Sequence, residues 1–234
     1  MVTAGRNHAL IVLCDGRVLS FGHCSPGALG HGDARGRSLP TEIHALRGDP
    51  VAYAAAGQHH SIFVTNAGSA FSCGNGAHGQ LGLGDKSDAL VPTCVSQLPQ
   101  GQVMKCSAGV HTSCFLLLDG SAWTCGSGKY GIPGHGHKKD VLTPKRISLL
   151  CPKKSVFVEV SLGPTHALLL SYDCITCCLG FAKNFQKGVR ASIRASVFGL
   201  GSNASGQLGS MPDDEVWTPK ELSLPLGMIP VATA

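Results

Sequence analysis

The sequence predicts an all-β protein, a β-propeller of four-stranded antiparallel blades with about four blades present. Three observations carry this prediction. One motif recurs four times at a spacing of 52 to 54 residues. Each copy contains short apolar runs that end at glycine-containing turns, as hairpin strands do. Glycine is abundant, with 31 of 234 residues, which suits tight turns and opposes helices.

The repeat begins with Ala4-Gly5-Arg6-Asn7-His8 and keeps its register through four markers. The first glycine recurs at Gly5, Gly57, Gly109 and Gly163. An apolar-Gly pair follows, ending at Gly22, Gly74, Gly126 and Gly201. A glycine block begins five residues later and reads Gly79-Gln80-Leu81-Gly82 in the second copy and Gly206-Gln207-Leu208-Gly209 in the fourth. A proline follows each pair, at Pro40, Pro92, Pro144 and Pro219, and a fixed period of this length is typical of repeat architectures.

Each repeat is expected to supply four strands, of which the second copy is typical. The run 51–54 is the first strand, the apolar run 61–65 is the second, and 70–73 is the third. In the third strand Phe71 and Cys73 share one face, following the two-residue period of a strand. The segment after the proline, Thr93-Cys94-Val95, is the fourth strand. A proline at its start indicates an outer edge, because a missing N–H does least harm there.

One blade cannot bury both of its faces, so the repeats are expected to stack and share a core. We therefore predict a single array over residues 1–234, with repeats at about 1–50, 51–102, 103–155 and 156–234. The fourth repeat carries about 21 extra residues, approximately 174–195, where the other copies have a tight turn between the second and third strands. This segment is either a long flap at the rim or a product of a retained intron or gene-model error.

These motifs resemble the regulator-of-chromosome-condensation repeat. The best matches are AGQHHSIFVTNAGSAFSCGNGAHGQLGLG at 56–84 and GLGSNASGQLG at 199–209. The resemblance implies a seven-bladed propeller, of which four repeats are part, and the chain starts and stops at the same phase of the repeat. A fragment or truncated product is therefore expected, with a closed four-bladed ring as the alternative. The sequence departs from the family at four positions where a tryptophan is usual (Phe21, Cys73, Cys125 and Leu200), at Thr112 in place of histidine, and at Ile132-Pro133 in place of Gln-Leu.

Composition narrows the function classes. The net charge is only +5 without a long basic run, so direct nucleic-acid binding is not expected. No secretory signal or membrane-length apolar stretch is visible, which favours an intracellular protein, cytoplasmic or nuclear. Eleven cysteines, an odd number, fit reduced thiols better than disulfides. Those in predicted strands, Cys14, Cys73, Cys106, Cys114 and Cys125, are expected to be buried hydrophobes.

No cofactor, metal or catalytic site is predicted. Cys174, Cys177 and Cys178 form only half of a zinc knuckle, and zinc usually takes four ligands. His8, His60 and His166 repeat, whereas a catalytic group need occur once, so each ring is expected to hydrogen-bond backbone within or between blades. The glycines Gly32, Gly84 and Gly136 lack the Gly-Lys-Ser/Thr ending of a phosphate loop and are expected to be positive-φ turns.

The predicted function is a protein-interaction scaffold. Propeller rims present variable loops on a rigid frame, and partners bind those loops. The turns between the first two strands should cluster near the central axis, which makes Arg6, Asn7, Gln58, His59, Val110 and His111 the candidate partner-binding residues. The resemblance leaves two alternatives: guanine-nucleotide exchange on a small nuclear GTPase, without covalent chemistry, or part of a multidomain protein such as a ubiquitin ligase.

Overall fold

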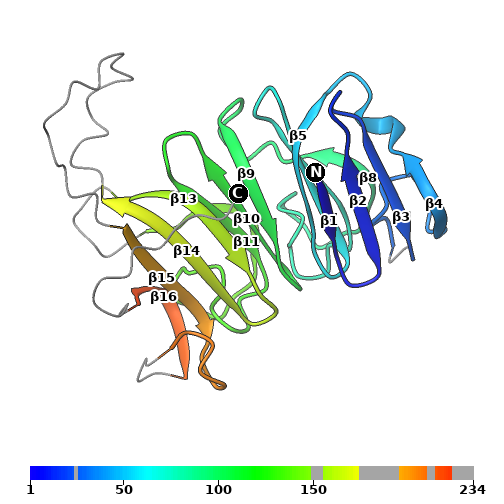
Figure 1. The fold of residues 1–234 in the computed structure, drawn as a ribbon. Coiled ribbons are helices and arrows are strands. Elements are labelled where there is room, and N and C mark those ends of the chain that lie inside the picture. Colours follow the sequence, from blue (N-terminus) through cyan, green and yellow to red (C-terminus); the bar gives the residue numbers. More distant parts are fainter. Residues whose placement is uncertain (24–25, 149–154, 174–194, 210–213, 223–234) are drawn as a thin grey trace, which may run out of the picture.

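The computed structural model describes residues 1–23, 26–148, 155–173, 195–209 and 214–222, which form four four-stranded antiparallel sheets side by side (Figure 1). The predicted all-β architecture is confirmed. The first and fourth sheets lie at opposite ends of the row, so the described sheets form an open array and not a closed ring of four. The only helix in this part of the chain is the three-residue 3-10 turn η1 (His44–Leu46), so no helix there is long enough to cross a membrane.

Each sheet is a meander in which sequential strands are neighbours. The first sheet contains β1 (Val2–Ala4), β2 (His8–Val12), β3 (Val18–Gly22) and β4 (Arg37–Glu42). The second contains β5 (Val51–Ala56), β6 (His60–Thr65), β7 (Ala70–Gly74) and β8 (Ala89–Cys94). The third contains β9 (Val103–Ala108), β10 (Thr112–Leu117), β11 (Ala122–Gly126) and β12 (Val141–Arg146). The fourth contains β13 (Ser155–Leu162), β14 (His166–Asp173), β15 (Ala195–Ser202) and β16 (Glu215–Glu221).

The outer strand of each sheet begins earlier than the sequence predicts. Pro92 lies inside β8 rather than at its start, and Pro40, Pro144 and Pro219 occupy the same place in β4, β12 and β16. In all four sheets the pairing with the third strand shifts register close to the proline, for example between Ser72 and Gly74. A proline cannot donate to the ladder, so it interrupts the pairing without ending the strand. The predicted edge position is confirmed.

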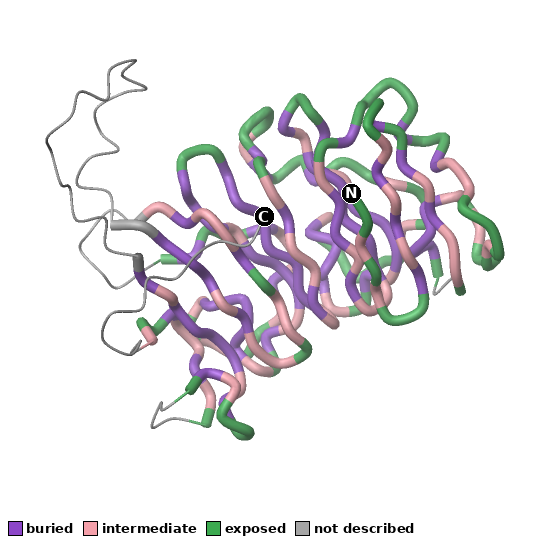
Figure 2. The backbone as a smooth tube through the Cα atoms, viewed as in Figure 1, coloured by how far each residue is buried: buried purple, intermediate pink, exposed green. Residues whose placement is uncertain are grey.

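The core lies between neighbouring sheets. Leu10 and Val12 of β2 pack with Phe63 of β6 and Cys73 of β7, and Ile62 and Val64 pack in the same way against the third sheet. Figure 2 shows the buried residues along the strands and the exposed ones at the turns. Burial of both faces of a sheet thus depends on its neighbours, as in other repeat arrays.

The predicted burial of cysteines is confirmed at Cys73, Cys106, Cys114 and Cys125 and is wrong at Cys14, which is exposed. The second strand of the first sheet ends at Val12, so Cys14 lies in the following turn. The apolar run continued past the strand because Leu13 and Cys14 lead into the Asp15-Gly16 turn.

The extra residues of the fourth repeat follow β14 and precede β15, as predicted. These strands pair up to Tyr172 and Ala195, where the tight turn of the other sheets would lie. Residues 174–194, including Cys174, Cys177 and Cys178, lie outside the described residues. The predictions made for them remain predictions.

Candidate functional site

One face of the array collects the turns that the sequence singles out. Because strands alternate in direction, the turn between strands one and two emerges on the same side as the loop between strands three and four. We call this side the axial-turn face; it is the lower edge of the row in Figure 1. It comprises the turns 5–7, 57–59, 109–111 and 163–165, and the described residues of the loops after the third strands, 23, 26–36, 75–88, 127–140, 203–209 and 214.

Each axial turn is closed by the same backbone hydrogen bond. The N–H of Gly57 donates to the carbonyl of His60 at 2.9 Å, and Gly5, Gly109 and Gly163 do likewise in their own turns. Neighbouring turns then pack backbone to backbone. A Cβ atom at Gly57 would lie only 2.6 Å from the carbonyl oxygen of Gly109 and from Nδ1 of the His60 ring, which explains why glycine opens every repeat.

The four turns surround a shallow hollow of about 230 Å³. The residue after each first glycine lines it, and these positions grade from charged through polar to apolar: Arg6, Gln58, Val110 and Pro164. The structure therefore brings together Arg6, Gln58 and Val110 as the sequence predicts, although 52 residues separate consecutive members. Their role in partner binding stays a prediction.

The last residue of each axial turn is hydrogen-bonded to the backbone where the third strand of the same sheet ends and the following loop begins. The carbonyl oxygen of His59 accepts the N–H of Asn75 at 2.9 Å, and the carbonyls of Asn7, His111 and Thr165 accept equivalent bonds from His23, Ser127 and Ser202. The backbone of these residues is thus fixed, while Asn7 stays exposed and His59 and His111 stay half-buried.

His111 belongs to a group of ionisable side chains that sequence reasoning missed in part. Its ring lies 4.5 Å from that of His78, measured between centroids. Nδ1 of His78 is 3.8 Å from a carboxylate oxygen of Asp140, which also accepts a 2.7 Å hydrogen bond from Lys86. Burial and the nearby His78 lower the pKa of His111, and burial with Arg6 lowers the pKa of His59. Both rings are therefore mainly neutral at physiological pH.

The repeated histidines are structural, as predicted, but their partner differs from the prediction. Nε2 of His8 lies 2.9 Å from the hydroxyl of Ser61 in the next sheet, and His60 is placed likewise against Ser113. The serine, rather than the histidine, bonds the backbone: the Ser61 hydroxyl donates to the carbonyl of Ala28 at 2.6 Å. These serines were missed, although each directly follows the motif histidine position, which His60 occupies before Ser61 and Thr112 occupies before Ser113.

The boundary between the third and fourth sheets lacks this pair. Thr112 occupies the histidine position, and Ala167 occupies the serine position in the fourth sheet. The hydroxyl of Thr112 is buried without a hydrogen-bond partner. His166, the motif histidine of the fourth sheet, has its Nδ1 buried without a partner as well.

The glycine blocks hold the outer loops, as their recurrence suggests. Leu81 and Leu208 are almost fully buried, and Gly79, Gly82, Gly206 and Gly209 have positive φ. The Gln80 amide accepts the N–H of His78 and donates to Asn75, both at 2.9 Å, while Gln207 accepts the N–H of Ser205.

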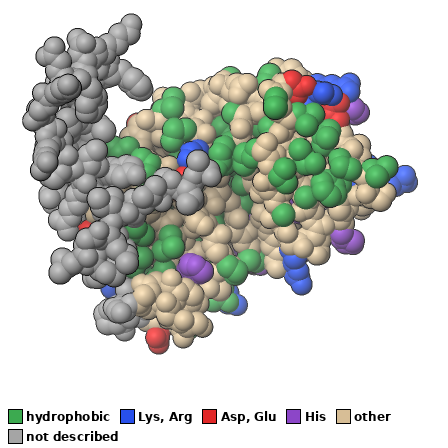
Figure 3. Space-filling model, in the orientation of Figure 1, with side chains coloured by type: hydrophobic (Ala, Val, Ile, Leu, Met, Phe, Trp, Pro, Cys, Tyr) green, Lys and Arg blue, Asp and Glu red, His purple; other side chains and the backbone are tan. Residues whose placement is uncertain are grey.

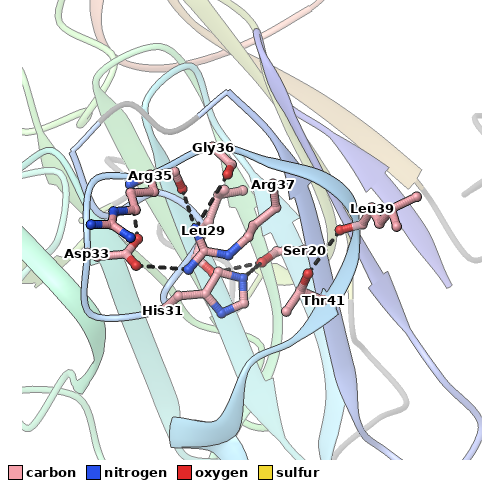
Figure 4. Close-up of polar contacts among 9 residues, drawn as sticks. All are labelled: Ser20, Leu29, His31, Asp33, Arg35, Gly36, Arg37, Leu39 and Thr41. Atoms are coloured by element: carbon pink, nitrogen blue, oxygen red, sulfur yellow. Dashed lines mark hydrogen bonds and ion pairs between the residues drawn. The ribbon is translucent and has the colours of Figure 1, made fainter.

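The first outer loop shows the same design with other side chains (Figure 4). The Ser20 hydroxyl donates to the carbonyl of Leu29 at 2.7 Å and contacts Nε2 of His31, and Asp33 pairs with Arg37 at 2.9 Å. The loop then reaches the next sheet, since Gly32 donates to the carbonyl of Leu90 in β8. The predicted positive φ of Gly32, Gly84 and Gly136 is confirmed.

Within the described residues, no cluster of histidine, cysteine or acidic side chains has the geometry of a metal site. The Ser-His pairs resemble nucleophile and base only in residue type. Ser61, Ser113 and His60 are fully buried, so a substrate cannot reach them. The arrangement on this face is that of a surface for contact, presented on a rigid sheet array.

Four stacked meander sheets that repeat one motif define the β-propeller class of repeat proteins. A family model described as the regulator of chromosome condensation (RCC1) repeat matches residues 15–64, 67–116 and 119–170. The chain belongs to the RCC1 repeat family. Each matched segment starts near the turn after a second strand and ends inside the second strand of the next sheet, so the family repeat and the sheet are out of phase.

Known relatives agree with this assignment. The ultraviolet-B receptor UVR8 of Arabidopsis thaliana is 33% identical over 188 residues, covering 80% of this chain and 42% of the receptor. The human E3 ubiquitin-protein ligase HERC2 is 36% identical over 160 residues, covering 68% of this chain and 3% of the ligase. The chain thus spans less than half the length of either relative.

Solved structures share the fold. Human WBSCR16 superposes with a TM-score of 0.75 at 23% identity, over 96% of this chain and 53% of that protein. Yeast RCC1 (Prp20), solved bound to Kap60, gives a TM-score of 0.73 at 20% identity, over 96% and 48%. The four sheets therefore correspond to about half of each of these proteins.

Proposed function

We propose that this RCC1-repeat chain is an interaction scaffold that binds a protein partner through its axial-turn face. One observation carries the proposal. Four turns that are 52 to 54 residues apart in sequence converge on one hollow, and each places a different side chain there. Structural repetition with chemical variation is what a rigid frame with a specific contact surface requires.

The frame around the hollow supports this role. The glycines of the turns pack against one another, and the turn carbonyls are bonded to the outer loops. The side chains of Arg6, Gln58 and Val110 are therefore held on a preformed backbone, which lowers the conformational cost of binding. The relatives fit in outline, since yeast RCC1 was solved bound to another protein, Kap60.

Nucleotide exchange on a small GTPase is the alternative activity, and it too would proceed without covalent chemistry. A structure of yeast Prp20p was reported together with its binding to Gsp1p and histones. At 21% identity that likeness supports a shared fold and leaves the partner open. Binding is therefore the broader proposal, and exchange is a possible consequence of it.

Site-directed photo-crosslinking tests the proposal. A benzoylphenylalanine at Gln58 should capture a partner in cells, whereas the same group at Ala67, exposed on the opposite face, should not. Arg6→Ala together with Val110→Ala should reduce capture from position 58. Capture from Ala67 alone would overturn the proposal. Release of a fluorescent nucleotide from a small GTPase, measured with the captured partner, then decides between scaffold and exchange factor.

A further inference from the structure

The charge pattern of the axial-turn face indicates what kind of partner it fits. We propose that the partner presents an acidic segment with an adjacent apolar side chain, and that its binding is coupled to protonation of His59 and His111. This inference rests on the proposed function and names the chemistry of the partner. The segment would place a carboxylate near Arg6 and its apolar side chain near Val110.

Histidines are concentrated on this face. Ten of the eleven lie in its turns and loops or begin the strand that follows a turn, and the exception is His44 in η1. The members are His8, His23, His31, His59, His60, His78, His111, His135, His137 and His166. Protonation of the partly exposed members therefore adds positive charge to this face, whereas the buried His8 and His60 stay neutral down to about pH 4.

The axial turns themselves carry no acidic residue. Residues 5–7, 57–59, 109–111 and 163–165 include Arg6 and two histidines but neither aspartate nor glutamate. Four carboxylates in the neighbouring described loops are already engaged: Asp140 with Lys86, Asp33 with Arg37, Asp88 with the N–H of Gly76, and Asp85 with the N–H of Ser87. A fifth, Asp214, is exposed, but the hollow itself has no acidic residue in its lining. An incoming carboxylate thus meets cationic and neutral groups around the hollow.

The turns of the opposite face, unlike the axial turns, include acidic residues such as Asp15 and Asp119. Asp15 pairs with Arg17, and Glu42 lies between Arg17 and Arg47 at 3.8 and 2.9 Å. Figure 3 shows acidic and basic side chains together at the upper right, on the side where η1 lies in Figure 1. A mixed surface of this kind gives an acidic segment no comparable attraction.

The lining of the hollow offers separate contacts for the acidic and the apolar side chains of the proposed segment. Arg6 and Gln58 offer hydrogen-bond donors, whereas Val110 and Pro164 offer apolar contact. A purely polyanionic chain would leave the Val110 side unused. A segment with alternating acidic and apolar residues uses both, which is why we favour it over a nucleic acid.

Protonation of His59 and His111 responds to the groups around them. His59 faces Arg6 and lies near His8, His60 and His111, and His111 faces His78, Asp140 and Lys129. In the unbound chain, burial and these mostly positive neighbours hold both pKa values below 6.5. A bound carboxylate opposes that effect, so binding takes up protons and strengthens as the pH falls, by at most tenfold per pH unit for each proton.

The test uses the full chain and two synthetic fluorescein-labelled peptides, Gly-Glu-Leu-Glu-Leu-Glu-Gly and its analogue with glutamine for glutamate. Fluorescence anisotropy at pH 5.5, 6.5 and 7.5 should show at least tenfold tighter binding of the glutamate peptide at pH 5.5 than at pH 7.5. The glutamine peptide should bind at least tenfold more weakly at pH 5.5. Circular dichroism at each pH ensures that only folded protein is compared.

Three variants assign the effect. Arg6→Gln should weaken glutamate-peptide binding about tenfold at every pH, and the double variant His59→Gln/His111→Gln should remove most of the pH dependence. His44→Gln, at the one histidine outside this face, should leave both unchanged. Equal binding of the two peptides, an unchanged pH profile in the double variant, or tighter binding of a single-stranded oligonucleotide would overturn the inference.

The two proposals fail separately. If position 58 captures a protein partner but the glutamate peptide does not bind, the acidic-segment inference falls and the axial-turn face remains the binding surface. If crosslinks arise only from Ala67, both fall.

Discussion

His60 of β6 and Ser113 of β10 form a hydrogen bond between the second and third sheets, with Nε2 3.0 Å from Oγ. Ser113 donates its only hydroxyl proton to the carbonyl of Gln80 at 2.5 Å, so it must accept from the ring. The ring therefore carries a proton on Nε2. Burial lowers the pKa of His60 to about 3, so Nδ1 stays unprotonated and the ring is neutral.

Removing this hydroxyl should destabilise the array. Ser113→Ala leaves the Nε2–H of His60 without a partner in the core and leaves the Gln80 carbonyl only the weak Cys125 thiol, at 3.6 Å. Loss of a buried partner costs about 1–3 kcal/mol. We expect the free energy of unfolding, measured by urea denaturation, to fall by about 2 kcal/mol. Ser96→Ala, at an exposed serine, should change it by no more than about 0.5 kcal/mol. Equal effects of the two variants would contradict the role given to Ser113.

The boundary between the third and fourth sheets can be used for the reverse experiment. Thr112→His with Ala167→Ser rebuilds the pair that the other two boundaries contain. Each single variant buries a polar group without its partner. The double variant should therefore be more stable than the sum of the two single-variant changes in unfolding free energy predicts, with a coupling energy of about 1–2 kcal/mol. Additive effects in urea denaturation would show that this boundary cannot accept the pair.

Stability should decrease in mildly acidic solution. In the folded state the pKa of His8 is lowered to about 4 and that of His60 to about 3, from 6.5, chiefly by burial. Unfolding frees both rings to take up protons, so their stabilising effect is complete above pH 6.5 and is lost progressively towards pH 4. The slope is at most about 1.4 kcal/mol per pH unit for each ring. Urea denaturation between pH 7.5 and pH 5 measures it, and His60→Gln should flatten the profile by roughly one proton.

Glycines at equivalent φ values should tolerate alanine to different degrees. Gly74 has a φ of 110°, and an added Cβ would lie 2.7 Å from Cα of His60. Gly48 has a φ of 98° with open space around it. Gly48→Ala should therefore cost only the backbone strain, about 1 kcal/mol, whereas Gly74→Ala should cost about 3 kcal/mol or more. Thermal unfolding of the two variants checks the order, and a reversed order would count against the packing of the turn on β7.

The exposed cysteines of the described residues should react with thiol reagents, and the buried ones should not. Burial raises the pKa of Cys106, of Cys125 and, to about 12, of Cys114, and thiolates are the reactive species. Cys14 and Cys94 are exposed. Iodoacetamide followed by peptide mass spectrometry should label these two in native protein, and Cys106, Cys114 and Cys125 only after unfolding. Native labelling of Cys114 would contradict the packing between the third and fourth sheets.

The sequence by itself determined the repeat, the number and order of strands in each sheet, and the convergence of Arg6, Gln58 and Val110. These features follow from local rules: glycine at positive φ, two-residue alternation, and a fixed period that places equivalent turns in equivalent positions. The Cys14 error and the misplaced strand start at Pro92 arose where local pattern alone sets no boundary.

Only the tertiary structure decided the contacts between sheets. The His60–Ser113 bond and the His78–His111 contact each join residues from different sheets or loops. The Thr112 hydroxyl lies at the next boundary between sheets and is left unpaired there. Their partners depend on how one blade is turned against the next, which no spacing within a single repeat records. The sequence period therefore determines the strands and turns that every blade shares. The contacts between blades depend on stacking, because each core lies between faces of two sheets that differ in their side chains.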